Sequence, residues 1–270
     1  AMERVDHFGF ATVVRLRDVI LPGPEWAGDQ DLARVSRMEI GFNSLSLLTG
    51  NLALHDVTID GAQLYLFRAA DGRESWHGTT GRGGKGGGGL QDLVVRQSRL
   101  TYVDQKQDRR FTLQVASDPK AGLRLRGDGT IRGTSVQIAA QAPAISSVNE
   151  GKWPFDVRLT GRALTMHAKG IMAAPLDTEH MALEVTAEAS DLKLVDAIIE
   201  AGLFRTQPVT LSASVRREPD KWLIDRLSGR IGRSDLSGKL VVNKEGERTK
   251  LDGSFESRQL DFDDLSSDEG

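Results

Sequence analysis

A lysine enclosed by glycines is the first feature of the sequence whose composition could support chemistry. Lys85 lies within the run from Gly83 to Gly89. A loop that cradles a nucleotide phosphate has the pattern G-x-x-x-x-G-K-[ST] and joins a buried strand to a helix. Here Gly86 follows the lysine, and neither an apolar strand nor a helical pattern flanks the run. We therefore predict a flexible linker or loop at this position rather than a phosphate-binding loop.

The residue types that serve catalysis or hold metals are scattered along the chain. The five histidines show neither H-x-x-x-H nor H-x-H spacing and so indicate no metal site; they are His7, His55, His77, His167 and His180. Cysteine is absent and no G-x-S-x-G element occurs, which removes thiol chemistry and the serine nucleophile elbow. The sequence predicts a protein that is not an enzyme and that needs no cofactor.

The charge balance argues against a nucleic-acid partner. The chain of 270 residues carries 35 Lys+Arg and 38 Asp+Glu, with a net charge of -3. No stretch reaches the roughly 18 apolar residues that a membrane-spanning helix needs. The opening Ala1-Met2-Glu3 and the acidic end after Ser266 lead us to treat the sequence as a fragment. We expect an N-terminal signal or anchor to precede it.

Alternation of apolar and polar residues predicts that the chain is mostly β-strand. A period of two gives a strand one apolar and one polar face. Such segments cover residues 11–21, 34–42, 52–59, 62–68, 90–103, 111–115, 155–163, 183–189, 209–216, 223–231, 236–242 and 251–262. A helical turn is predicted near residues 43–50. A helix is also predicted, which Ser190-Asp191 caps and which ends at Gly202. The expected fold is mainly β: an extended antiparallel sheet with a few short helices.

A change in composition predicts how the chain is divided. Residues 1–68 form one β segment, and residues 69–89, rich in glycine and polar residues, form a flexible linker or loop. Residues 90–265 form a second β region, and residues 266–270 form an acidic tail. The pattern leaves open whether the two β regions share one sheet.

Several segments together resemble the AsmA family of bacterial envelope proteins. They are residues 14–19, 33–40, 45–52 and 57–66 in the first third of the chain, and 192–195, 227–238 and 251–265 in the second half. The family also carries a D-G-x-x-N-W element before a low-complexity gap. Asp71 to Trp76 is similar to that element, with Ser75 in place of asparagine.

The resemblance implies a lipid-transfer function in the cell envelope. Family members are periplasmic and are anchored to the inner membrane by an N-terminal helix, which this sequence does not contain. They resemble bridge-like lipid carriers with a long, curled sheet whose concave face is apolar. The implied partners are phospholipid or another lipid, the inner membrane, and a protein of the outer membrane or periplasm. The implied function is non-enzymatic transport of phospholipid between the inner and outer membranes, in support of outer-membrane biogenesis.

Under this resemblance, eleven apolar residues of the alternating strands are predicted to line a lipid-binding groove. They are Phe155, Val157, Leu159, Leu183, Val185, Val209, Leu211, Val215, Leu240, Val242 and Phe255. The same alternation would arise if these residues formed the core of a closed sandwich or barrel. A different function also fits an exposed sheet edge: a periplasmic scaffold that assists outer-membrane protein assembly or envelope integrity.

Overall fold

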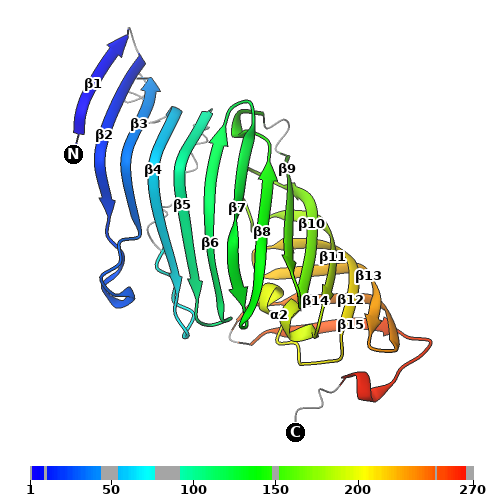
Figure 1. Cartoon of the computed structure of the whole chain (residues 1–270). Helices are drawn as coiled ribbons and strands as arrows, with labels where there is room; N and C mark the ends of the chain where they lie inside the picture. The colour runs from blue at the N-terminus through cyan, green and yellow to red at the C-terminus, as the bar shows by residue number, and fades with distance from the viewer. Residues whose placement is uncertain are drawn as a thin grey trace. The chain divides into compact units, whose positions relative to one another are not determined.

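The chain divides into two compact units. A computed structural model describes residues 2–8, 11–43, 54–76, 92–147, 152–246 and 248–265. The first unit comprises Ala1–Asp128 and Gln141–Val148, and the second comprises Gly129–Ala140 and Asn149–Gly270. Each unit is built from neighbouring strands that lie side by side (Figure 1).

The prediction of a mainly β fold is confirmed. Within the described residues, fifteen strands form a sheet whose strand order follows the sequence. Their bounds are β1 (Met2–Phe8), β2 (Ala11–Leu21), β3 (Ala33–Asn43), β4 (Leu54–Arg68), β5 (Asp92–Asp104), β6 (Arg109–Asp118), β7 (Gly122–Ile131), β8 (Thr134–Ala142), β9 (Trp153–Gly161), β10 (Leu164–Met172), β11 (Met181–Ala189), β12 (Val209–Glu218), β13 (Lys221–Ile231), β14 (Ser234–Asn243) and β15 (Lys250–Glu256). Tight turns join most neighbours, as expected for a meander.

Some strand boundaries differ from the predicted ones. The segments 52–59 and 62–68 form the single strand β4. Gly61, between them, has a φ of 69° that glycine tolerates, so the strand continues through this position. The segment 251–262 is shorter than predicted, since β15 ends at Glu256. Strands β1, β7, β8 and β10 were not predicted. In β10, Ile171 on the otherwise polar side obscures the alternation.

Helical structure is sparse in the described part of the chain. The single α-helix is α2 (Leu192–Ile199), and three short 3-10 turns are η1 (Glu25–Ala27), η2 (Ile145–Ser147) and η3 (Phe262–Leu265). Asp191 caps α2 as predicted, by accepting a hydrogen bond from the backbone N–H of Lys193. The helix ends before the predicted stop, at Glu200 in the left-handed conformation. The turn expected near residues 43–50 lies almost entirely outside the described residues.

The sheet departs from the expected one in two ways. Strands β4 and β5 pair in parallel, for example Val57 with Leu93, whereas all other pairs with a recorded register are antiparallel. The residues before position 69 and after position 89 therefore share one sheet, which the sequence left open. The sheet is also not strongly curled, contrary to expectation. Strong curvature needs bulges or kinks repeated through the sheet. The ladders β9–β10, β10–β11 and β11–β12 run without a register shift, whereas β12–β13 and β13–β14 each contain one.

Two predicted segments fall partly outside the described residues. Of the predicted linker 69–89, residues 69–76 form tight turns in which Gly72 N–H donates to the Ala69 carbonyl at 2.9 Å. Residues 77–89, which include the lysine within the glycine run, lie outside the described part, as does the predicted tail 266–270.

Candidate functional site

Antiparallel pairing in the second unit aligns apolar side chains in rows across the strands. Because paired residues point to the same face, each row continues from strand to strand. The recorded pairs give three rows: Phe155, Gly170, Leu183, Val215, Ile224 and Leu240; Val157, Ala168, Val185 and Ala213; and Leu159, Met166, Ala187, Leu211, Gly229 and Leu236. One face of this part of the sheet is therefore almost purely hydrocarbon.

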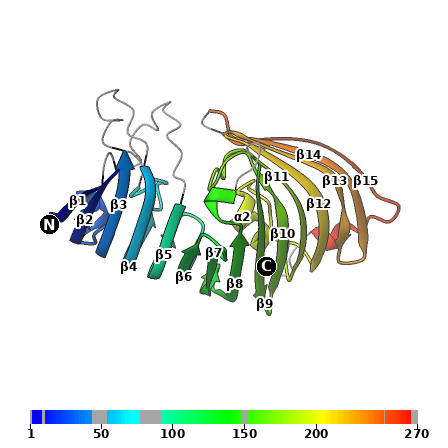
Figure 2. The same cartoon turned by 90° about the horizontal axis from the view of Figure 1, so that it is seen from above.

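Helix α2 lies on this apolar face (Figure 2). The helix occupies the connection between β11 and β12, and it directs Leu192, Val195 and Ile199 toward the sheet. Its amphipathic pattern explains the placement, since residues three and four apart share one side of a helix. The apolar face is thus covered by a helix and not by a second sheet in the described part of the chain.

A buried carboxylate fixes the end of α2. Asp196 is 3% exposed, and its Oδ1 accepts hydrogen bonds from the backbone N–H groups of Gly202 at 2.7 Å and Leu203 at 2.9 Å. Its Oδ2 lies 3.4 Å from Lys193 Nζ and 3.8 Å from Arg132 Nη2. These contacts compensate the buried negative charge of Asp196, and they hold the loop after α2 in place.

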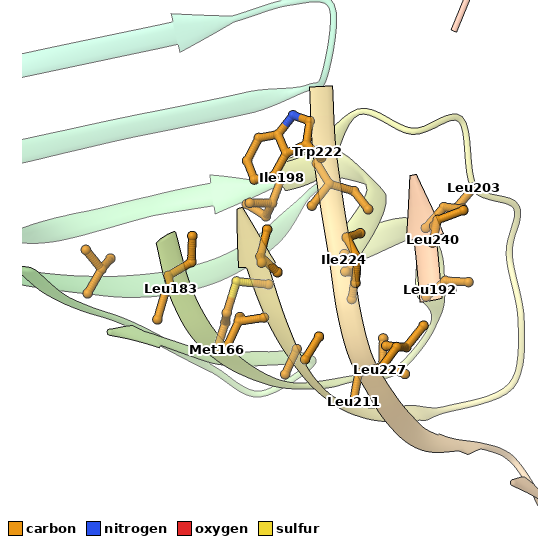
Figure 3. Close-up of a pocket in the computed structure, with 18 of the residues that line it drawn as sticks. Met166, Leu183, Leu192, Ile198, Leu203, Leu211, Trp222, Ile224, Leu227 and Leu240 are labelled. Carbon is orange, nitrogen blue, oxygen red and sulfur yellow. The ribbon is translucent and has the colours of Figure 1, made fainter. Parts of the chain in front are cut away.

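Sheet and helix together enclose an apolar cavity of about 390 Å³. Figure 3 shows side chains from several strands and from α2 pointing into it, among them Met166, Leu183 and Ile198. Apart from Thr178 and the indole N–H of Trp222, the described residues that line it offer no polar side-chain group. The Arg217 guanidinium lies 5.0 Å from the centroid of the Trp222 ring, so a half-buried cation packs against this apolar side chain.

Nine of the eleven predicted groove residues line this cavity. They are Phe155, Val157, Leu159, Leu183, Val185, Leu211, Val215, Leu240 and Phe255. The structure does not bring the other two to it: Val209 is 2% exposed, and Val242 is fully buried in the core with Ala213 and Ile224. Both side chains are closed off by neighbouring residues, so alternation identified their face correctly but not their access to the cavity.

Several cavity residues were missed in the sequence. Met166, Ala168 and Met172 belong to β10, where the alternation of apolar and polar residues was present but interrupted. Trp222 lies one residue before the predicted strand 223–231 and so fell outside the alternating segments. The residues Leu192, Val195, Ile198 and Ile199 belong to the predicted helix, but nothing in the sequence showed what their apolar side would cover. Leu203 follows the predicted helix stop, Gly202, and was not predicted.

Two histidines lie beside carboxylates in the described residues of the second unit. His167 Nε2 lies 3.1 Å from Asp156 Oδ2, which Arg158 Nη2 also approaches at 3.5 Å, and His180 Nδ1 lies 3.0 Å from Asp177 Oδ2. No group of three or more potential metal ligands occurs among the residues described. The described helices include none that is long and apolar enough to cross a membrane.

The first unit buries one charged cluster around Asp104, whose side chain is fully buried. Its carboxylate contacts Arg109, lies 3.4 Å from Arg68 Nη1 and accepts the Tyr102 hydroxyl at 3.1 Å. Burial opposes ionisation, but the hydrogen bond and charge of Arg109 bring the pKa of Asp104 below its ordinary value. Burial, followed by the nearby carboxylate, raises the pKa of Tyr102 to about 12. The cluster joins β4, β5 and β6, which indicates a structural role.

Comparisons with known proteins identify no relative. No family model, no curated protein and no solved structure matches the chain. The site must therefore be interpreted from its own geometry.

Proposed function

We propose that the second unit binds the acyl chain of a lipid in the cavity between the sheet and α2, without catalysing a reaction. The observation that carries the proposal is the apolar lining of this cavity, in which Thr178 supplies the lone hydroxyl among the described residues. Its volume of about 390 Å³ lies within the range of roughly 300–1,000 Å³ common for small-molecule sites.

The chemistry of the lining favours a hydrocarbon chain over a polar ligand. Transfer of each methylene group from water into such a lining contributes about 0.8 kcal/mol. A polar ligand would lose its hydrogen bonds to water and find almost no replacements. The headgroup of a bound lipid would then remain in solvent, so the cavity would select for the chain and not for the headgroup.

The resemblance to the AsmA family supports a more specific version of this proposal. In that version, the protein lies in the periplasm, is anchored to the inner membrane, and carries phospholipid toward the outer membrane. The apolar rows along β9–β14 would provide the surface on which an acyl chain moves. Nine of the eleven residues chosen under that resemblance line the cavity, which is what a lipid carrier of this kind would need.

The test is to quantify lipid in the purified protein by organic extraction and mass spectrometry. We expect close to stoichiometric phospholipid in the wild-type protein, and loss of it in Leu211→Asp, because Leu211 lines the cavity and a carboxylate would be desolvated by the chain. Ser212→Asp is the matched control, since Ser212 is exposed on the same strand and is not part of the lining. Lipid at the level of an unrelated protein from the same cells would contradict the proposal.

A second candidate function is a scaffold that binds a partner protein by strand pairing. The observation in its favour is β15, which ends the strand order and is exposed along all seven residues. The last strand of a sheet presents unpaired backbone groups to a partner strand. Stoichiometric capture of an envelope protein, lost when a proline replaces Ser254 in β15, would favour this function; capture unaffected by the proline would not.

A further inference from the structure

A groove on the polar face of the first unit gathers positive charge. It has a volume of about 610 Å³ and crosses β4, β5, β6 and β7. Arg99, Arg124 and Arg126 line it, and no aspartate or glutamate does. The chain as a whole carries a net charge of -3, so this concentration of cations is local.

The three arginines lack carboxylate partners in the described part of the chain. Some other arginines do pair closely with a carboxylate, as Arg15 does with Glu39 at 3.1 Å and Arg226 with Glu184 at 2.7 Å. Three unneutralised guanidinium groups in one groove repel each other, and an anion bound between them would relieve that repulsion.

Irregular backbone shapes the groove at its centre. The β5–β6 register shifts between Val95 and Ser98, and Gln97 has a φ of 47°, which is uncommon outside glycine. On β4 the backbone N–H of Ala62 donates to the Ser98 hydroxyl at 3.1 Å instead of to a backbone carbonyl. A bulge of this kind redirects side chains, and here Gln97 and Ser98 both line the groove.

The remaining lining supplies neutral hydrogen-bond donors beside the cations. Gln63, Gln97 and Gln114 come from three adjacent strands, and each amide can donate two hydrogen bonds. Planar guanidinium groups bind phosphate oxygens in a bidentate manner, and amides can satisfy the oxygens that remain. No aromatic residue lines the groove to stack on a base, which argues against a nucleic-acid strand.

We propose that this groove is a binding site for the phosphate group of a phosphorylated ligand. The ligand can be a soluble phosphate compound or the headgroup of a phospholipid, since both present the same oxygens. The site is independent of the apolar cavity, because its lining lies wholly within the first unit.

The experiment titrates the full chain, labelled with nitrogen-15 in arginine, with inorganic phosphate and with glycerol 3-phosphate. We expect the side-chain signals of Arg99, Arg124 and Arg126 to shift together, beyond the effect of chloride at the same ionic strength. Replacing all three by glutamine should weaken binding at least about tenfold, since each charge-assisted contact contributes substantially. Arg110→Gln is the matched control, because Arg110 is exposed on β6 outside the groove.

A second arm distinguishes the source of the phosphate. The same variants are floated with vesicles of phosphatidylcholine and with an equal mixture of phosphatidylcholine and phosphatidic acid. Vesicle binding that requires phosphatidic acid and is lost in the triple variant, without a response to the soluble ligands, identifies a lipid headgroup. A response to the soluble ligands identifies a site for free phosphate compounds. The proposal is overturned if neither arm depends on the three arginines, or if Arg110→Gln weakens binding equally.

Discussion

The same alternation of residues leads to different outcomes in the two units. In the second unit, the apolar rows of β9–β14 meet helix α2 across a cavity. In the first unit, the apolar side of β5 and β6 carries aromatic rings that pack on one another: the ring centroids of Tyr102 and Phe111 are 6.0 Å apart, and Trp76 lies 5.9 Å from Tyr102. A period of two determines which residues share a face, but the element that covers the face decides whether a cavity remains beside it.

The polar faces differ in the same way. In the second unit, Arg226 contacts Glu184 and Ser214 on the exposed side of the sheet, so its charge is neutralised locally. In the first unit, three arginines and three glutamines line one groove, which has no acidic residue in its lining. We infer that ligand-binding capacity lies on the apolar face in the second unit and on the polar face in the first.

The largest effect that would sharpen the comparison is expected at Val209. Because Val209 is 2% exposed and lies outside the cavity, Val209→Asp should reduce the free energy of unfolding of the second unit by about 4 kcal/mol. Urea unfolding followed by the fluorescence of Trp153, which is buried in the same unit, measures this change. Leu211→Asp should cost clearly less, since Leu211 is only half-buried and its carboxylate keeps access to water in the unliganded protein. Equal losses at the two positions would mean that the cavity is a closed core.

The next effect concerns the charged cluster of the first unit. Asp104→Asn removes the negative charge beside Arg109 and Arg68, so we expect the first unit to lose about 3 kcal/mol of unfolding free energy. Trp76 fluorescence reports this transition, because its ring lies against Tyr102. Asp128→Asn, at an exposed position on β7, serves as the control and should change little. A similar loss of unfolding free energy in both variants would contradict the claim that the buried Asp104 cluster stabilises the first unit.

The pH dependence of the first unit should follow from the same carboxylate. The pKa of Asp104 is lowered in the folded protein, so its stabilising effect is fully present above the unfolded value of about 3.9. The effect is lost as pH falls through the lower folded pKa. Acid unfolding monitored at Trp76 should therefore become less steep in Asp104→Asn, whereas an unchanged profile would mean that other carboxylates control the transition.

The comparison also shows how far the sequence alone could go. Period two predicted most of the strands, the shared face and nine of the cavity residues, because alternation is a property of the strand itself. Strands β1, β7, β8 and β10 were not predicted. The alternation did not distinguish Leu211 from Val209, two residues apart on one face, because access depends on which neighbours cover each side chain. The arginine groove was not predicted either. Arg99 lies 25 residues before Arg124 and 27 residues before Arg126, and it meets them only through strand pairing and a bulge.

The smallest effect tests the element that makes the two units differ. The Asp191 side chain caps α2, so Asp191→Ala should lower the free energy of unfolding of the second unit by about 1 kcal/mol. Asp191→Asn should retain most of the stability, because asparagine can accept the same hydrogen bond from Lys193 N–H. If α2 closes the cavity, Asp191→Ala should also reduce retained lipid while Asp191→Asn does not. Equal lipid in the two variants would show that the sheet alone holds the chain, and that the helix serves mainly as packing.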